Sequence, residues 1–359
     1  MAGSLKKLIE TYEPFKGKTV LIALEGAPDP DSMSSALAHR RILSTLDIDT
    51  VILHAKPVSH QENRAAMKLL GIEFTYYDRR EEEQKTEGRF DFSQFAGYAV
   101  VDSQRPDSDI AEHLTELPLI SRVDHHGAVK GEEALAALYD DVRPNIGATA
   151  TIYTQYLKSG KLLDYEESES LATALLHGIY TDTKDFLKAT RQDFEAAAYL
   201  AGFANMKTFR EISEESLSEK GLEGFARGVD PQRHVRIGSY VLASAGVLTK
   251  NDSDVIPQIA DLLVNVDGMH TVVVYGIIDD IVRGSVRTSS AKERPKEFIH
   301  ETFPEIRRFG GKADEGGFTM PLAEFSGVLS PKSDLDLLEQ CVDRYFQSRF
   351  REHFNENGK

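Results

Sequence analysis

The sequence is poor in cysteine, in long apolar runs and in positive charge, and each shortage excludes a class of protein. Its 359 residues include one cysteine, Cys341, so neither a disulfide nor a cysteine-based zinc site can form within one chain. The longest apolar runs, such as 271–278, are far too short to span a bilayer, and the first residues lack the apolar core of a signal peptide. We therefore expect a cytoplasmic protein without membrane contact.

The charge balance limits the partners of the chain. It has 42 Lys and Arg residues against 58 Asp and Glu residues, a net charge of −16. Binding to long duplex DNA depends on neutralising phosphates with Lys and Arg, so this composition argues against such a partner. A small phosphorylated substrate, held by metal ions and a few local cations, remains compatible with it.

Apolar periodicity divides the chain into two parts. Over the first part, strand-like runs alternate with helical patterns, which predicts an α/β fold with a mainly parallel, doubly wound sheet and helices on both faces. The second part predicts a smaller α/β domain, with strands at 234–246, 271–279 and 281–289. We expect a first domain at 1–226, a linker at 227–234 and a second domain at 235–359, with an active-site cleft between the domains.

Acidic residues and histidines follow the predicted strands of the first domain. In an open α/β sheet, ligands bind outside the carboxyl ends of the strands, so these side chains should meet at one edge. Each alone is a common turn or cap residue, but together they predict a binding site. The candidates at four element ends are Glu25, Asp29 and Asp31, then Asp102, then Asp124, His125 and His126, and finally Asp182.

Carboxylates crowded in this way repel one another unless cations neutralise them. Mixed Asp and His ligands favour Mn²⁺, and Mg²⁺ or Co²⁺ are also possible. About six ligands leave room for two ions, and two ions about 3.5–4 Å apart assist displacement at phosphorus. The sequence of the first domain therefore predicts a metal site suited to phosphoryl chemistry.

The second domain has its own candidate anion site. The glycine-rich stretch 310–317 would let backbone N–H groups converge on an anion, and Lys312 within it adds positive charge. Arg287 offers a bidentate contact to phosphate. The alternative interpretation is a tight loop and a surface arginine.

Four motifs in order give the chain a family resemblance: APDPDSMSSALA (27–38), VVDS (100–103), VDHHG (123–127) and TDTKDF (181–186). The sequence resembles the DHH phosphoesterase superfamily, in the subfamily with a DHH-associated C-terminal domain. That group includes nano-RNases that also act on 3′-phosphoadenosine 5′-phosphate, cyclic-dinucleotide phosphodiesterases and the RecJ exonuclease. The stretches 284–290 and 310–318 resemble the signature of the associated domain.

The resemblance implies roles for these residues. Asp102 and Asp182 would bridge two Mn²⁺ ions, with Asp29 on one ion, and Asp31 and His125 on the other. The catalytic residues would be Asp102, His125 and His126, the last touching the scissile phosphate or assisting protonation. Asp124 would orient the His125 ring without itself binding the metal.

Two positions depart from the family pattern. Glu25 occupies the place of a histidine in the first motif, and its carboxylate can also serve as a metal ligand. Lys312 occupies the place of the histidine in a Gly-Gly-His triplet. By resemblance, the substrate-binding residues would be Arg287, Gly310, Gly311 and Lys312.

The sequence thus predicts a metal-dependent phosphoesterase for small nucleotides or very short oligoribonucleotides. The alternatives are a pyrophosphatase or polyphosphatase, or a nucleotide-binding regulator with a decayed metal site. A homodimer is possible, because the apolar positions of a predicted helix at 331–350 could serve either a core or a dimer contact. Those positions are Leu335, Leu338, Val342, Phe346 and Phe350.

Overall fold

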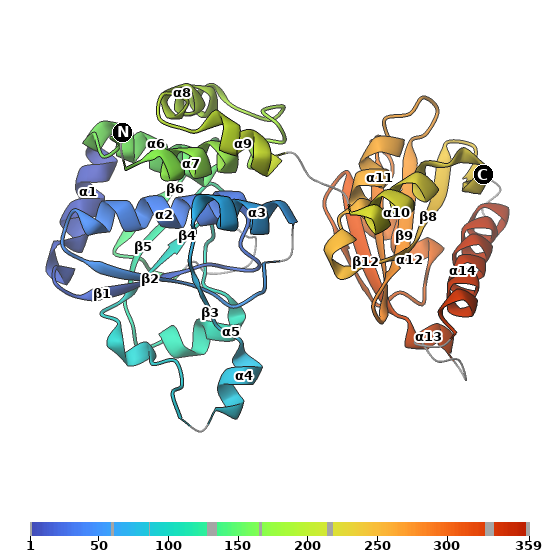
Figure 1. Cartoon of the computed structure of the whole chain (residues 1–359), viewed down its shortest axis with the longest axis horizontal. Coiled ribbons are helices and arrows are strands. Elements are labelled where there is room, and N and C mark those ends of the chain that lie inside the picture. The colour runs from blue at the N-terminus through green and yellow to red at the C-terminus, as the bar shows by residue number, and fades with distance from the viewer. Residues whose placement is uncertain are drawn as a thin grey trace. The chain divides into compact units, whose positions relative to one another are not determined.

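The chain forms two compact units, Met1–Glu215 and Ser216–Lys359 (Figure 1). The structure is a computed structural model that describes residues 2–58, 61–85, 87–127, 135–164, 167–213, 218–326 and 334–356. No helix within these ranges combines the length and the apolar character needed to cross a lipid bilayer. Each unit contains a sheet with its own hydrophobic core.

The described part of unit 1 contains a sheet of six strands, called sheet A, in the order β3-β2-β1-β4-β5-β6. Every pairing in it is parallel. The chain winds outward from β1 in one direction and from β4 in the other, so the topological switch point lies between these two strands. The strands are β1 Thr19–Ala23, β2 Asp49–His54, β3 Thr75–Tyr76, β4 Tyr98–Val101, β5 Leu119–Asp124 and β6 Tyr139–Val142.

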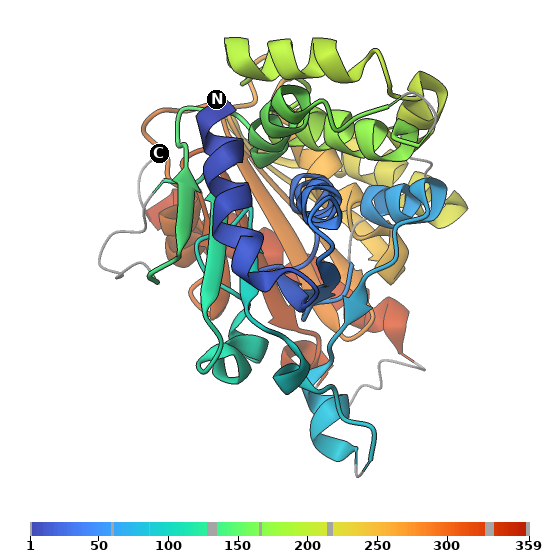
Figure 2. The same cartoon turned by 90° about the vertical axis from the view of Figure 1, so that its left-hand side faces the viewer.

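One face of sheet A is covered by long helices (Figures 1 and 2). Alternate strand residues such as Val20 and Ile22 pack there against α1, α2, α6 and α7 in a single core. Helices α8 and α9 pack on α7. The helices of this group are α1 Ala2–Tyr12, α2 Pro30–Ser44, α3 Gln61–Leu70, α6 Thr149–Gly160, α7 Glu169–Asp182, α8 Arg191–Leu200 and α9 Met206–Ser213.

The opposite face of sheet A has a thinner cover. Leu21, Tyr98 and Val100 point to this side and pack against residues of two short helices, Ile110 and Leu114. The short elements of unit 1 are α4 Arg79–Gln84, α5 Ser108–Ala111, and the 3-10 helices η1 Glu13–Phe15, η2 Phe92–Gln94 and η3 Glu112–Leu114.

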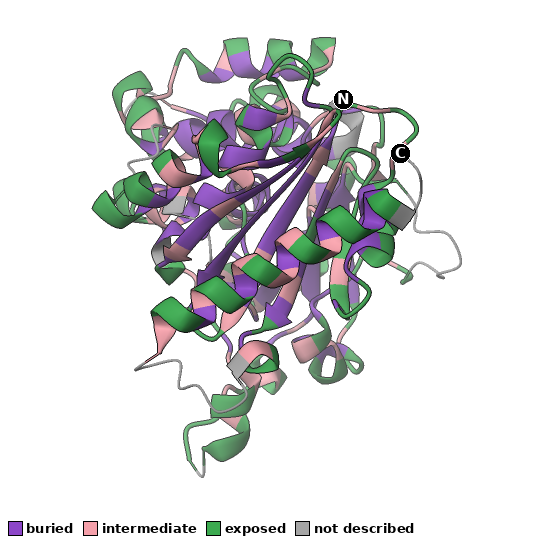
Figure 3. Cartoon of the chain, turned by 90° about the vertical axis from the view of Figure 1, so that its right-hand side faces the viewer, coloured by how far each residue is buried: buried purple, intermediate pink, exposed green. Residues whose placement is uncertain are grey.

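Unit 2 is built on sheet B, in the order β11-β12-β10-β9-β8-β7. Only β8 and β9 pair in parallel among its described strands. Helices α12 and α14 pack on one face and α10 and α11 on the other, so the strands are largely buried (Figure 3). The elements are α10 Glu219–Val229, η4 Pro231–Arg233, β7 Val235–Ile237, β8 Tyr240–Leu248, η5 Lys250–Asp252, α11 Val255–Leu263, β9 Thr271–Ile278, β10 Ile281–Thr288, α12 Pro295–Thr302, β11 Arg308–Gly311, β12 Glu315–Pro321, α13 Ala323–Ser326 and α14 Leu335–Glu356.

The predicted α/β class, with a doubly wound parallel sheet and a second α/β domain, is confirmed. The units divide earlier than the expected linker at 227–234, because α10 packs on β8 of unit 2. The predicted strand 234–246 is two strands, β7 and β8, joined by a turn. The glycine-rich stretch 310–317, expected as a loop, is a loop only at 312–314: Gly310 and Gly311 of β11 pair with Gly317 and Gly316 of β12.

The apolar positions of the last helix belong to the core of unit 2. In α14, Leu338, Val342, Phe346 and Phe350 are buried against β10, β12 and α12, and Leu335 packs at the margin of the same cluster. Of the two roles predicted for these side chains, the structure therefore assigns the core role.

Gly178 allows α7 to pack closely against the start of α2. A Cβ atom at this position would lie 2.6 Å from Ser34 Oγ, 2.9 Å from Pro30 O and 3.1 Å from Asp31 Cα. We expect Gly178→Ala to lower the free energy of unfolding by about 1–2 kcal/mol, because overpacking exceeds the helix propensity that alanine gains. Denaturant unfolding measures this change.

Gly202→Ala is the matched control, since its added Cβ would make only an ordinary contact, 3.4 Å from Tyr199 O. Equal stability of the two variants would contradict the packing role assigned to Gly178.

Candidate metal centre

The carboxyl edge of sheet A brings four of the six predicted metal ligands together at the switch point. Asp31 lies in the first turn of α2, just after β1, and Asp102 directly follows β4. His125 follows β5, and Asp182 is the last residue of α7. Ligand atoms of Asp31, His125 and Asp182 lie within 4.8 Å of one another, as do those of Asp102, His125 and His126.

His125 stands at the centre of this cluster. Its Nε2 atom lies 3.0 Å from Asp182 Oδ2, 3.7 Å from Asp102 Oδ1 and 3.9 Å from Asp31 Oδ2. Its Nδ1 atom lies 3.2 Å from the carbonyl oxygen of Ile146, which fixes the ring. The Nε2 atom is buried and makes no hydrogen bond to any described residue, despite the short distance to Asp182. A buried imidazole nitrogen aimed at three carboxylates is the arrangement of a metal ligand.

Asp31 is anchored by the N-terminus of α6. Its two carboxylate oxygens accept hydrogen bonds of 2.7 Å from the backbone N–H groups of Thr149 and Ala150. These are unpaired donors at the positive end of the helix dipole, so they favour a negative charge on Asp31. Burial and the charge of Asp182 nevertheless raise the pKa of Asp31 to about 7.

Asp102 is held in an unusual backbone conformation. Its φ of 56° lies in the left-handed region, which Asp and Asn enter more readily than other non-glycine residues. Its Oδ1 atom accepts a hydrogen bond of 2.8 Å from the hydroxyl of Thr149. Burial, together with the charges of Asp31, Asp29 and Asp182, raises the pKa of Asp102 well above its usual range.

His126 lies at the rim of the centre, with its side chain 56% exposed. Asp124 Oδ1 accepts from both the backbone N–H and the ring Nδ1 of His126, at 3.1 and 2.8 Å. Asp124 was predicted to orient His125, and this was wrong: it orients His126, and the Ile146 carbonyl orients His125. The physical reason is local: where the chain turns after β5, Asp124 Oδ1 lies against the residue two positions on, His126.

The remaining carboxylates differ in their placement. Asp29 caps α2, accepting from the backbone N–H of Ser32, and its charge acts on Asp31 and Asp102. Glu25 joins neither cluster within the described residues: its carboxylate accepts from the Ser103 hydroxyl and lies 3.8 Å from Arg105 Nε. Its proposed ligand role would require it to leave Ser103.

The electrostatics of the cluster fit a bound cation. Burial lowers the pKa of His125, but Asp182 and Asp31 outweigh burial and raise it to about 9. The pKa values of Asp31 and Asp102 rise as well, first because both groups are buried and second because the neighbouring carboxylates repel them. Positive charge would therefore stabilise the cluster, and a divalent ion supplies that charge without protonating the ligands.

The predicted substrate-binding residues of unit 2 gather around Glu315. Arg287 donates from Nε to Asp261 at 2.5 Å and from Nη1 to Ser285 at 2.8 Å, and its Nη2 lies 3.9 Å from Glu315. Lys312 is 85% exposed, and its Nζ lies 3.8 Å from Glu315. Gly310 and Gly311 are strand residues of β11, so their N–H groups do not form the predicted loop nest.

Two residues that support the centre were not predicted. Thr149 contacts both Asp31 and Asp102 from the start of α6. Asp193 is fully buried and accepts from the Gly147 N–H and, at 2.6 Å, from the Thr151 hydroxyl, so it fixes the segment that carries Thr149. A threonine before an apolar helical run signals a helix start, but no local pattern links Asp193 to residues more than 40 positions away.

A fold with its switch point at a buried cluster of aspartates and a histidine defines an α/β protein with a site for divalent cations. Residues 19–179 match the family described as DHH family, N-terminal domain. An uncharacterized protein of Methanocaldococcus jannaschii, MJ1633, is 32% identical over 346 residues, 96% of this chain. The chain spans 66% of that relative's length.

Among solved structures, the chain is similar to an exopolyphosphatase-related protein from Bacteroides fragilis, with a TM-score of 0.65 and 15% identity. The match covers 97% of this chain and 98% of that protein, and it shows a shared fold. The exonuclease RecJ bound to manganese is a more distant likeness, with a TM-score of 0.46, 14% identity and coverage of 99% and 96%.

Asp102→Asn tests the centre with little disturbance of the backbone, because asparagine also tolerates the left-handed conformation. We expect its Mn²⁺ affinity, measured by titration calorimetry, to fall by more than the roughly 10- to 100-fold typical for loss of a supporting residue. Glu25→Gln should weaken binding by less than this range, because Glu25 lies outside both clusters. An equal loss in the two variants would instead make Glu25 a full ligand.

Thr149→Val removes the hydroxyl that supports Asp102 and keeps the shape of the side chain. We expect Mn²⁺ affinity to fall by roughly 10- to 100-fold, as for other groups that position a metal ligand. Thr149→Ser keeps the hydroxyl and should bind Mn²⁺ nearly as the wild type does. If the two variants bind equally, the Thr149 hydroxyl has no part in ordering the centre.

Proposed function

We propose that this protein is a divalent-metal-dependent phosphoesterase. The observation that carries the proposal is the buried Nε2 atom of His125, directed at Asp31, Asp102 and Asp182 at the switch point of a parallel sheet. The DHH-family match over residues 19–179 supports the same reaction class. A metal ion bound there supplies a Lewis acid and lowers the pKa of bound water.

The proposed ligands fall into two sets that share Asp102 and Asp182. Asp29 completes one set, and Asp31 and His125 complete the other. Both sets combine carboxylate with at most one imidazole, which suits Mn²⁺, with Mg²⁺ or Co²⁺ as further candidates. Two sets with shared carboxylates are consistent with two ions.

His126 is the proposed contact to the scissile phosphate. Its ring is half exposed, and Asp124 accepts from Nδ1, which leaves Nε2 as the atom available to a substrate. Burial raises the pKa of Asp124, but the hydrogen bonds and the charge of His126 outweigh burial, so the pKa lies below its usual value. The bond to Asp124 in turn raises the pKa of His126. A protonated ring can donate to a phosphate oxygen.

The proposed substrates are small nucleotides or very short oligoribonucleotides. The net charge of −16 disfavours long polyanions, which require many cationic contacts. Arg287 and Lys312 are proposed as the substrate contacts of unit 2, where the guanidinium would exchange its carboxylate partners for phosphate. Unit 2 is thus the proposed substrate-binding domain.

A substrate panel with Mn²⁺ tests the proposal. It contains a nucleoside 3′,5′-bisphosphate, a linear diribonucleotide, a five-nucleotide RNA, a cyclic dinucleotide and pyrophosphate, with Asp102→Asn as the control. We expect turnover of a nucleotide member and a loss of at least about 100-fold in Asp102→Asn, equivalent to 2.7 kcal/mol of barrier.

Preferred turnover of pyrophosphate would replace the nucleotide assignment with a pyrophosphatase. If the folded wild type binds Mn²⁺ but turns over no member with Mn²⁺, Mg²⁺ or Co²⁺, the phosphoesterase proposal fails and a nucleotide-binding regulator takes its place.

A further inference from the structure

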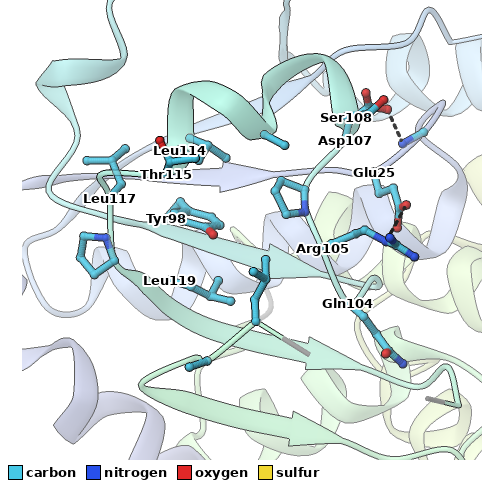
Figure 4. Close-up of a pocket in the computed structure, with 16 residues that line it drawn as sticks. Glu25, Tyr98, Gln104, Arg105, Asp107, Ser108, Leu114, Thr115, Leu117 and Leu119 are labelled. Carbon is cyan, nitrogen blue, oxygen red and sulfur yellow. Dashed lines mark hydrogen bonds and ion pairs between the residues drawn. The ribbon is translucent and has the colours of Figure 1, made fainter. Parts of the chain in front are cut away.

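A cavity of about 990 Å³ lies on the thinly covered face of sheet A (Figure 4). Its floor includes Tyr98 at the start of β4 and Leu119 at the start of β5. Ala111 and Leu114, on α5 and η3, form one wall. The cavity extends along the sheet as far as the loop that follows β4. Its size is sufficient for a nucleotide, because ligand sites typically measure about 300–1,000 Å³.

The loop that forms the mouth of this cavity also belongs to the metal centre. Ser103 and Gln104 directly follow Asp102, and the Gln104 Nε2 donates to the carbonyl oxygen of His126 at 3.1 Å. The Ser103 hydroxyl donates to Glu25, which lines the cavity with Gln104. A ligand in the cavity mouth therefore reaches Gln104, which is two positions after Asp102 in the chain and bonds to the backbone of His126.

The lining changes from apolar to charged along the cavity. The inner part presents Leu114, Leu117 and Leu119 together with the ring of Tyr98. The Tyr98 hydroxyl makes no hydrogen bond within the described part of the chain, and Figure 4 shows it directed toward the space between the walls. The mouth presents the guanidinium of Arg105, 3.8 Å from Glu25.

This arrangement suits a ligand with a flat apolar part and an anionic end. Aromatic rings pack well on apolar side chains, and a single hydroxyl can select a polar ring edge. A guanidinium at the mouth can exchange a carboxylate for a phosphate. Inorganic phosphate or pyrophosphate would leave the apolar inner part unused.

We propose that this cavity receives the base and sugar of a nucleotide whose phosphate lies at the metal centre. The proposal rests on the proposed phosphoesterase function and narrows it to substrates that carry an aromatic base. Arg105 contacts a phosphate oxygen, and the Tyr98 hydroxyl hydrogen-bonds to the edge of the base. The cavity is thus the feature that distinguishes a nucleotide from pyrophosphate.

Thr115→Trp tests the proposal by filling the cavity. Thr115 lines the cavity and is exposed, so a large side chain can enter without displacing the core. Glu116→Trp is the matched control, because Glu116 is the next residue and is not among those lining the cavity. The wild type has no tryptophan, so blue-shifted emission from Trp in the first variant, and not in the second, reports that the cavity is filled.

The probe is adenosine 5′-monophosphate, and its binding is measured by calorimetry with Mn²⁺ present. We expect Thr115→Trp to weaken binding by about tenfold or more and Glu116→Trp to leave it nearly unchanged. Tyr98→Phe keeps the ring and removes the hydroxyl, and should weaken binding by about three- to tenfold. Inorganic phosphate, which lacks a base, should bind Tyr98→Phe and wild type alike.

Each outcome separates this proposal from the proposed function. If adenosine 5′-monophosphate does not bind the wild type, or binds both tryptophan variants equally with the cavity filled, the nucleotide assignment of the cavity is overturned. Should Thr115→Trp misfold, equal binding to Tyr98→Phe and wild type overturns it. Binding blocked by Thr115→Trp, without turnover of any panel member, supports the cavity and refutes the phosphoesterase. Nucleotide turnover with an unchanged KM in Thr115→Trp supports the phosphoesterase and overturns the nucleotide assignment of the cavity.

Discussion

The crowding of carboxylates at the switch point of sheet A is the constraint on which the rest of unit 1 depends. Asp31, Asp102 and Asp182 surround one imidazole, and two of the three carboxylates are almost fully buried. Such charges are expensive to bury without compensation. The surrounding structure supplies part of it, through the N-terminus of α6 and the hydroxyl of Thr149. A bound cation would supply the rest of the compensating charge.

The support for the centre comes from helix packing far from it in sequence. Gly178 lets α7 approach the start of α2, and this contact sets both Asp31 and Asp182 at one edge. Asp193 on α8 fixes the segment before α6. The long helices cover one face of the sheet and aim its ligands. The opposite face, on which short helices pack in the described part of the chain, retains the cavity.

The sequence was sufficient for features that local patterns encode. Acidic residues that directly follow apolar strands are expected to lie close together, because parallel strands end at a common edge. The pairing of β11 with β12 could not be predicted, since glycine carries little strand preference and the register depends on β10. The boundary between the units lies earlier than expected, because helical periodicity does not show that α10 packs on β8 of unit 2. The partners of Asp124 and Glu25 depend on side-chain directions at the strand ends, which spacing alone does not fix.

Asp31 both caps the N-terminus of α6 and is a proposed metal ligand. These two roles couple the ordering of the helix start to metal binding. The same two oxygens that accept from Thr149 and Ala150 would share their charge with a bound ion. The order of the first turn of α6 and the occupancy of the centre therefore depend on each other. The exchange rates of these two amide hydrogens thus become a local gauge of metal loading, independent of any catalytic assay.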